Sequence, residues 1–430
     1  MWSTQGTPAR RDERTTETRA LQFGAFAISA SFMVVFPLLP ALQERAHIGT
    51  AQLGWIATAG FVAALVAQTL IAPHADRGRE RLVLQGSILV MALSTLAYAL
   101  GDSVEWFIVG RLGAGLAYGA FMPAAKGLVI RRFPDMPGRQ IGRLHAVELA
   151  GMAFGPVLAV AGQSTIGVVP TIHAAAVLTL VAGAPAFLAG ASPLDAASAA
   201  TASNATTDDD EREHTSLLEG LALVRHRSVL AASLVMAAYF VPIGAYDALF
   251  PRFLADIGSS DLMIGAAMTA FAVPSMFLAG WAGRRVDRLG AFRAAGHGGV
   301  ANIAVLLTYA VVRLPMVIVV VGLFESAGQT LVGAAAAAAM GWAVPGRRAA
   351  TAQGIGEAFA TIAAALVAAT AAPLYAAGGA AALFVVTAVL TGLPLWGGIR
   401  LARGAEPVEE PLVLVPAPVR TPDRLVPAGA

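Results

Sequence analysis

Long apolar stretches and short polar ones alternate along the chain. Runs of roughly 20 predominantly apolar residues recur along it, and each is long enough to cross a hydrocarbon layer about 30 Å thick as an α-helix. The pattern predicts an all-α membrane protein with twelve spanning helices, at residues 22–42, 52–73, 82–101, 105–126, 144–163, 167–190, 229–250, 262–282, 292–312, 315–339, 350–373 and 377–399.

The longest polar stretch, 191–228, separates six predicted helices from the other six. Its first part is small, polar and acidic, which is typical of a disordered linker. Residues 215–228 carry apolar side chains at helical spacing and predict a helix lying on the membrane surface. We therefore expect an N-terminal segment at 1–20, a six-helix bundle at 21–190, a linker at 191–228, a second six-helix bundle at 229–401 and a disordered tail at 402–430.

The composition argues against several classes of binding site and energy source. Only 13% of the residues are charged, against about 25% in soluble domains, and a net charge of +2 gives no reason to expect a nucleic-acid partner. Cysteine is absent, which excludes disulfides and thiolate metal sites. The chain has no glycine-rich phosphate loop ending in Lys-Ser or Lys-Thr, so ATP is not expected as the energy source. We predict neither a cofactor nor a metal.

The basic residues predict the orientation. All but four of the 29 Lys and Arg fall in segments that lie on one side of a twelve-helix chain; the exceptions are Arg45, Arg111, Arg252 and Arg313. Positive residues are retained on the cytoplasmic side during insertion. The pattern therefore places both termini and the linker in the cytoplasm, in a multi-pass protein of the cell membrane. The richness in Ala and Arg suggests a bacterial source.

The two halves carry a weak repeat. Four pairs of identical residues lie 211 positions apart: Pro40 and Pro251, Gly54 and Gly265, Asp76 and Asp287, Arg77 and Arg288. Two parallel six-helix repeats are typical of transporters whose substrate site lies between the halves, near the middle of the bilayer.

Two polar loops carry related motifs. "GRRVDRLGAFR" at 283–293 contains Asp287, Arg288 and Gly290, and "PHADRGRERLVL" at 73–84 is a degraded copy that carries Asp76, Arg77 and Gly78. Two helices add shorter motifs: "RLGAGLAYG" begins at Arg111, and "GMAFGPVLAV" contains Gly151, Gly155 and Pro156. Together these motifs resemble those of the major facilitator superfamily, in particular its branch of twelve-helix drug–proton antiporters.

The resemblance implies a fold of two pseudo-symmetric six-helix bundles and gives the motif residues roles. Asp76 and Asp287 would hold one face of the two halves shut, with Arg77 and Arg288 nearby. Membrane topology alone also explains the arginines, though it explains the aspartates poorly. Pro156 removes a backbone donor and should loosen its helix, either for the antiporter interface that the family suggests or as part of plain helix packing.

Five Arg, Asp or Glu residues lie at least three positions inside the ends of predicted spans: Arg111, Glu148, Asp247, Glu325 and Glu357. Because a charge at the middle of a bilayer costs roughly 2.5–3.5 kcal/mol on insertion scales, such residues normally face protein or a wet cavity. Burial favours the neutral form of a carboxyl group, so one of them could load and release a proton.

The family resemblance implies that the first, fourth, seventh and tenth helices line the cavity. Arg111, Asp247 and Glu325 are then cavity candidates, with Gln329 one turn after Glu325. Glu325 lies ten residues into its span and is our first choice for the proton site. Asp247 is nearer the end of its span, so it could instead be a solvated residue at the cavity mouth. Arg111 could influence a carboxylate or link to backbone carbonyls.

Glu148 and Glu357 lie in equivalent helices, close to the predicted cytoplasmic side. His145 shares a helix face with Glu148 and is the residue type that titrates nearest neutral pH. The three residues predict either a proton relay through His145 and Glu148 or a contact between the halves that closes the cytoplasmic gate.

These observations predict a monomeric secondary transporter that works by alternating access and exports amphipathic or hydrophobic compounds in exchange for protons, as in multidrug efflux. The first and fourth helices carry few hydrogen-bonding side chains, which argues against a sugar site. An importer or an exchanger of lipids or metabolites on the same fold is the alternative. A membrane sensor or a membrane-embedded enzyme is more remote, since an enzyme would need converging groups and only His145 and Glu148 are paired.

Overall fold

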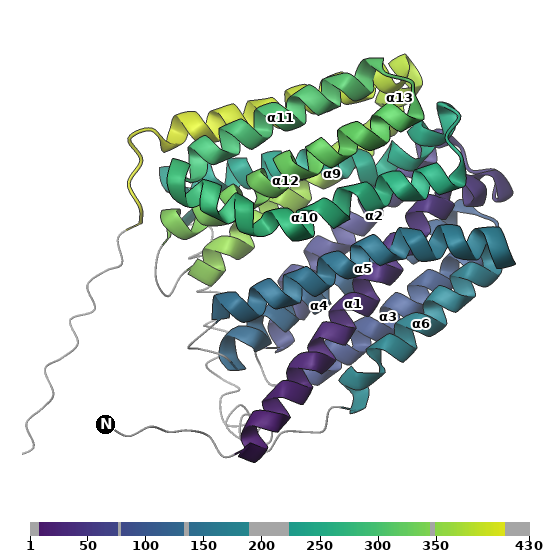
Figure 1. Cartoon of the computed structure of the whole chain (residues 1–430), viewed down its shortest axis with the longest axis horizontal. Helices are drawn as coiled ribbons and strands as arrows, with labels where there is room; N and C mark the ends of the chain where they lie inside the picture. The colour runs from purple at the N-terminus through teal and green to yellow at the C-terminus, as the bar shows by residue number, and fades with distance from the viewer. Residues whose placement is uncertain (1–7, 76–78, 133–136, 189–222, 345–348, 409–430) are drawn as a thin grey trace, which may run out of the picture.

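The computed structural model describes residues 8–75, 79–132, 137–188, 223–344 and 349–408. Within these ranges the chain is helical apart from short turns and ends. Helices α1–α6 form the N-terminal half and α9–α13 form the C-terminal half; in Figure 1 α9–α13 lie above α1, α3, α5 and α6.

The N-terminal half contains α1 (Pro8–Arg45), α2 (Thr50–Val66), α3 (Glu80–Leu100), α4 (Val104–Arg132), α5 (Pro137–Ile166) and α6 (Val168–Leu188). After α2 the chain continues as a π-helical turn over Ala67–Ile71 and a 3-10 turn over Ala72–Ala75. Several helices extend beyond the predicted spans because a helix does not end where the hydrocarbon layer does. The polar segment predicted at 1–20 is therefore helical from Pro8 onward.

The C-terminal half contains α9 (Arg227–Asp256), α10 (Asp261–Leu289), α11 (Ala291–Val311), α12 (Pro315–Ala343) and α13 (Ala349–Ala402). The loop predicted at 283–293 is wrong as a loop, because α10 and α11 are separated by Gly290 alone. Gly290 has φ +79°, a conformation that glycine adopts at little cost and other residues avoid. The turn can be this tight because a glycine stands there.

The last element, α13, contains both of the final predicted spans. Its 54 residues are interrupted by non-helical backbone at Gly378 and Gly379, the second with φ 61°. The chain runs along α9 in one direction before these glycines and in the other direction after them, as three contacts with α9 show: Ala364 with Gly244, Phe384 with Phe253, and Gly398 with Ala231. By length and composition, eleven helices among the described residues, α13 included, can cross a membrane.

We call the side of the molecule where α1 begins and α13 ends the termini side, at the left in Figure 1. On the opposite side one continuous hydrophobic core joins both halves and includes Val34, Ile56, Phe250, Tyr309 and Val367. On the termini side the cores are separate: one surrounds Phe121 in the N-terminal half, and two others lie in the C-terminal half. Among the described residues, the shared hydrophobic core therefore seals the halves together on the opposite side and not on the termini side.

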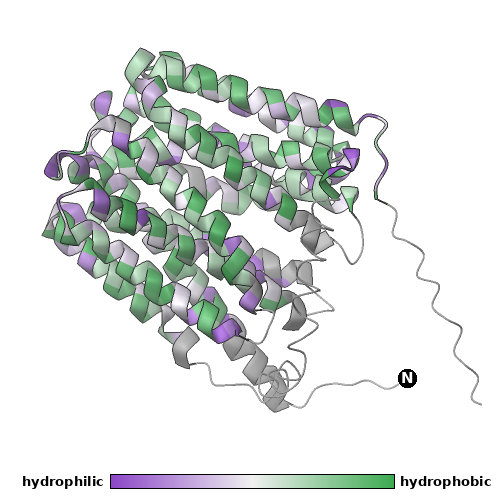
Figure 2. Cartoon of the chain, turned by 180° about the vertical axis from the view of Figure 1, so that it is seen from behind, coloured by the Kyte–Doolittle hydropathy of each residue, from purple (hydrophilic) through white to green (hydrophobic). Residues whose placement is uncertain are grey.

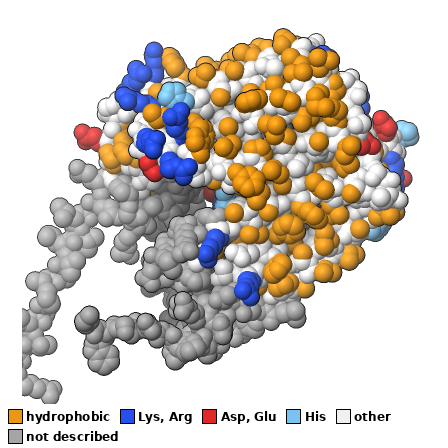
Figure 3. All heavy atoms as spheres, in the orientation of Figure 1, with side chains coloured by type: hydrophobic (Ala, Val, Ile, Leu, Met, Phe, Trp, Pro, Cys, Tyr) orange, Lys and Arg blue, Asp and Glu red, His pale blue; other side chains and the backbone are white. Residues whose placement is uncertain are grey.

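The outer surface is that of a membrane protein. Apolar side chains cover most of the face shown in Figure 3, and charged ones gather toward its ends; the helices are correspondingly green along their lengths in Figure 2. Phe277, Val311 and Phe324 are each more than 70% exposed. Exposed apolar surface of this extent is unfavourable in water, so these helix faces lie against lipid.

Candidate functional site: buried charges between the halves

The most buried ion pair among the described residues joins the two halves. Arg111 of α4 donates from Nη2 to Oδ2 of Asp247 on α9, and their side chains are only 7% and 6% exposed. The other carboxylate oxygen of Asp247, Oδ1, is buried and has no hydrogen-bond partner in the described part of the chain. The suggestion that Asp247 is a solvated residue at the cavity mouth is therefore wrong, because the opposing half covers it.

Aromatic rings and a glycine hold the Arg111 side chain in place. The guanidinium carbon lies 4.6 Å from the ring centre of Phe32 and 4.9 Å from that of Phe36, both on α1. The guanidinium group also interacts electrostatically with the buried Tyr98. A β-carbon at Gly60 would lie 2.8 Å from Arg111 Nε, so glycine leaves room for the arginine. Cation–π contacts of this kind strengthen when water is excluded.

Glu325 lies inside the C-terminal half. It is completely buried and accepts hydrogen bonds from the hydroxyls of Tyr246 and Tyr309, the second at 2.8 Å. Both donors belong to its own half, on α9 and α11. Because Tyr246 and Asp247 are neighbours on α9, a movement of this helix would act on Glu325 and on the pair with Arg111 together.

Glu148 on α5 forms a second cluster toward the termini side. It accepts hydrogen bonds from Tyr118 of α4 and pairs with Nδ1 of His145 at 2.9 Å. The Glu148 side chain is 6% exposed and that of His145 is 55% exposed. The structure thus brings together Glu148, which is buried, and His145, which is exposed, as the sequence predicted. Tyr118 is a further partner of Glu148.

Lys126 was missed as a site residue. It is the only lysine of the chain, and sequence reasoning counted it with the basic residues of a cytoplasmic segment. Because α4 continues to Arg132, Lys126 stays on the helix and lies 3.7 Å from Glu357 of α13, across the two halves. Lys126 also interacts electrostatically with Glu148. A lone lysine in an arginine-rich chain was the available clue.

Gln329 bridges three helices of the C-terminal half. It accepts a hydrogen bond from Asn302 on α11 at 2.6 Å and donates one to the backbone carbonyl of Tyr239 on α9 at 3.1 Å. The side chain therefore fixes α12 between its neighbours and has a packing role, although it shares a helix with Glu325.

The motif residues of the polar loops separate into two groups. Asp76, Arg77 and Gly78 lie outside the described residues. Asp287 and Arg288 are exposed on the last turn of α10, directly before the turn at Gly290. Their gating role remains a prediction.

The helix-5 motif lies at close helix contacts. A β-carbon at Gly151 would lie 2.5 Å from the carbonyl oxygen of Phe26, and one at Gly155 would lie 2.5 Å from that of Ala30. These glycines therefore let α5 approach α1 within the N-terminal half. The carbonyl of Pro156 lies near Gly265 of α10 instead, so this part of α5 belongs to the contact between the halves.

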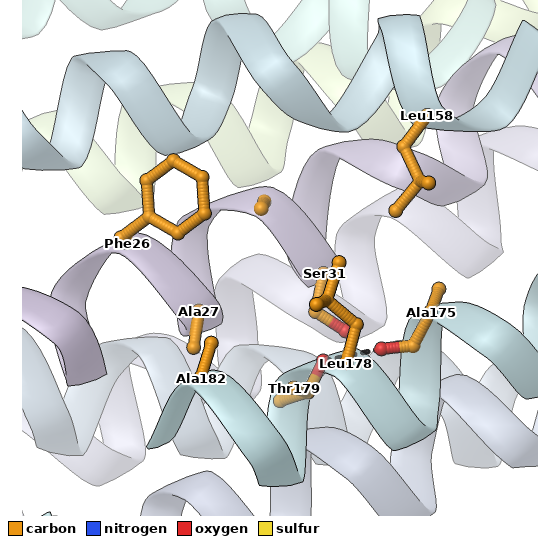
Figure 4. Close-up of a pocket in the computed structure, with 9 residues that line it drawn as sticks. Phe26, Ala27, Ser31, Leu158, Ala175, Leu178, Thr179 and Ala182 are labelled. Carbon is orange, nitrogen blue, oxygen red and sulfur yellow. Dashed lines mark hydrogen bonds between the residues drawn. The ribbon is translucent and has the colours of Figure 1, made fainter. Parts of the chain in front are cut away.

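A small hollow lies elsewhere, between α1, α5 and α6. Figure 4 shows Phe26, Ala27 and Leu158 around it, with the polar groups Ser31 and Thr179. None of the ionisable residues described above lines it. In the described part of the chain, no three His, Asp or Glu side chains gather as metal ligands would. The buried charges between the halves are thus the candidate functional site.

Comparisons with known proteins agree with this architecture. Residues 21–256, more than half of the chain, match the family model described as Major Facilitator Superfamily. The fold is similar to that of a bacterial homolog of the human lysosomal transporter Spinster in an inward-facing, unoccupied conformation, with a TM-score of 0.66, 14% identity, and coverage of 93% of this chain and 98% of that one.

The names of two relatives suggest different transport functions. The lincomycin resistance protein of Streptomyces lincolnensis is 31% identical over 132 residues, which are 30% of this chain and 27% of that protein. The maltose permease of Geobacillus stearothermophilus is 27% identical over 289 residues, 66% of this chain and 69% of that protein. The first match spans less than a third of its relative. The family match and the shared fold confirm the predicted fold class, and the chain belongs to the Major Facilitator Superfamily of transporters.

Proposed function

We propose that the protein exports amphipathic or hydrophobic compounds across the cell membrane in exchange for protons, by alternating access. The observation that carries the proposal is the buried Arg111–Asp247 pair, since it joins the two halves where their shared core seals the opposite side. A family member whose halves separate on that side must break this pair in every cycle.

The termini side is cytoplasmic in this proposal, because nearly all basic residues fall there. The separate cores on that side, and the partial exposure of His145, Lys126 and Glu357 on the inner faces of the halves, indicate a state open toward the cytoplasm. A compound in the cytoplasm or the inner leaflet would enter between the halves in this state.

Asp247 is the proposed coupling residue. When the opposite side opens, Asp247 loses Arg111, and a carboxylate without its counter-charge in a largely apolar cavity is protonated more readily. Uptake of one proton from outside neutralises it. When the halves close again on that side, the approach of Arg111 favours the ionised carboxylate and the proton is released toward the cytoplasm. A proton that crosses a potential of 100 mV releases about 2.3 kcal/mol, enough to bias the cycle.

Glu325 is the competing proton site, because it is wholly buried and two tyrosine hydroxyls hold it. Its partners stay in the same half, so opening the molecule does not remove them directly. We therefore prefer Asp247 to Glu325 as the proton site. From the sequence alone, Glu325 was the first choice.

The inner residues favour an amphipathic substrate. Phe32, Phe36 and Tyr118 form a continuous row of rings, with the Phe32 and Tyr118 ring centres 5.2 Å apart. Aromatic faces accept apolar and cationic groups. Similarity to a lincomycin resistance protein supports export. Similarity to a maltose permease over two thirds of the chain supports the second candidate, import of a polar solute.

Reconstituted vesicles can decide between these functions. An imposed pH gradient should drive movement of an amphipathic fluorescent dye, and Asp247→Asn should abolish the dependence on the gradient while dye exchange without a gradient persists. Asp102→Asn, at the exposed pair with Arg45 on the opposite side, is the matched control and should behave as the unaltered protein. Uptake of maltose without gradient-driven dye movement would overturn the export proposal. Loss of coupling in Glu325→Gln but not in Asp247→Asn would transfer the proton site to Glu325.

A further inference from the structure

A separate group of mostly basic residues lies on the lipid-facing surface of the C-terminal half, at the termini side. It consists of Arg293 and His297 on α11, Trp396 and Arg400 on the last turns of α13, and Arg403 directly after α13, and we call it the α11–α13 patch. All five residues are exposed. The transport cycle proposed above uses none of them.

Close helix packing brings the two parts of the patch together. A β-carbon at Gly296 would lie 3.4 Å from Ile399, and one at Gly299 would lie 2.1 Å from Leu395, so glycines let α11 and α13 touch. Arg293 precedes Gly296 by about one helical turn, and Arg400 directly follows Ile399. Since the helices run in opposite directions, the arginines of both ends lie within about one turn of each other along the bundle.

The patch borders the hydrocarbon-facing surface. On α11, Val300, Leu307 and Val311 are exposed on the same helix face as Arg293 and His297, and on α13 Val389 and Leu393 are exposed before Trp396. The indole of Trp396 is 56% exposed and the Arg400 guanidinium stacks on it at 3.9 Å. Tryptophan at such a boundary is typical of the level of lipid head groups.

The charge of the patch is not balanced locally. Arg293, Arg400 and Arg403 form no ion pair with any carboxylate in the described part of the chain. The nearest acidic residues in sequence, Glu406 and Asp287, are exposed. Arginine is weakly hydrated and its planar group matches phosphate geometry, so three arginines beside an exposed indole favour a phosphate attached to an apolar body.

The corresponding surfaces of the two halves differ in their basic and aromatic residues. The start of α3, which corresponds to the start of α11 in the repeat, carries Arg79 and Arg81, but α6, the counterpart of the end of α13, carries neither Trp nor Arg in Val168–Leu188. Among the described residues of these helices, the stacked indole and the second set of arginines therefore belong to the C-terminal half.

We propose that the α11–α13 patch binds the head group of one anionic phospholipid, with Arg293, Arg400 and Arg403 around the phosphate, Trp396 at the junction of head group and acyl chains, and the acyl chains along the exposed faces of α11 and α13. The proposal is independent of what the protein transports.

Lipid binding to the purified full chain tests this by native mass spectrometry in detergent, with phosphatidylglycerol or phosphatidylcholine added. One phosphatidylglycerol should be retained in preference to phosphatidylcholine. The double variant Arg293→Gln/Arg400→Gln should weaken its binding by about fivefold for each arginine removed. Arg19→Gln/Arg79→Gln, which removes two exposed arginines of the termini side from the other half, is the control and should leave binding unchanged.

Two further measurements distinguish recognition of a lipid head group from a plain charge effect and from binding of free phosphate. Arg400→Lys keeps the charge and removes the planar group stacked on Trp396, so an intermediate affinity is expected; because the charge is retained, this variant also serves if the double variant fails to fold. Inorganic phosphate in excess should not displace the lipid. Equal binding of both lipids, equal loss in the control variant, or displacement by inorganic phosphate would each overturn the proposal.

Discussion

In the described part of the chain, two ion pairs join the halves of this transporter, and they differ in almost every physical respect. Arg111 and Asp247 are buried, and aromatic rings and the continuous core of the opposite side surround them. Lys126 and Glu357 lie 3.7 Å apart on the termini side, with each side chain 36% exposed. The first pair belongs to a sealed interface, and the second spans two cores that do not meet.

The difference indicates which of the two ion pairs controls whether the halves can separate. A buried pair is costly to break because the remaining charge has no water to replace its partner. A partly hydrated pair is worth about 0–1 kcal/mol, because water can replace either partner. The opposite side can therefore open only when something compensates Asp247, whereas the termini side can open and close at little cost.

The largest effect is expected from Arg111→Gln, which leaves the Asp247 carboxylate buried without a counter-charge. The free energy of unfolding should fall by about 3–5 kcal/mol, measured by denaturant unfolding in detergent. Arg45→Gln is the control, since it breaks a pair with Asp102 whose side chains are 37% and 63% exposed, and it should change the unfolding free energy by less than about 1 kcal/mol. Equal losses in the two variants would remove the distinction between the pairs.

The next effect concerns the close packing on the opposite side. A β-carbon at Gly54 of α2 would lie 2.8 Å from the carbonyl oxygen of Ala368 on α13, whereas one at Gly86 of α3 would meet nothing within 4 Å. Gly54→Val should therefore destabilise the sealed state by about 1–3 kcal/mol through overpacking, and Gly86→Val should not.

The chain has no native cysteine, so opening can be measured with a single introduced one. The labelling rate of Thr58→Cys, beside Ala365 of α13 in the same contact, should rise in the Gly54→Val background and stay low in the Gly86→Val background. An unchanged rate in both backgrounds would show that this contact does not seal the opposite side.

Sequence reasoning predicted the fold well, because membrane-spanning helices can be recognised from the hydropathy of consecutive residues. It found α3 to within two residues at each end, and it placed Arg111, Asp247 and Glu325 inside spans. It could not find the Arg111–Asp247 pair, whose members are 136 positions apart and lie in different halves, because no local pattern records which faces meet. Lys126 was misplaced for a related reason, since hydropathy ends a helix earlier than backbone hydrogen bonding does.

The smallest effect on stability is expected at the partly exposed pair of Lys126 and Glu357. Lys126→Gln should lower the free energy of unfolding by no more than about 1 kcal/mol, because Glu357 keeps contact with water when its partner is lost. Its effect should instead appear in the distribution of states. In a variant with Cys at positions 126 and 357, a bifunctional maleimide should cross-link the halves, and an amphipathic dye that occupies the space between them should slow the cross-linking. A Lys126→Gln variant as unstable as Arg111→Gln would show that the termini side carries a buried, sealing contact like the one on the opposite side, and the asymmetry on which the inward-open interpretation rests would then be lost.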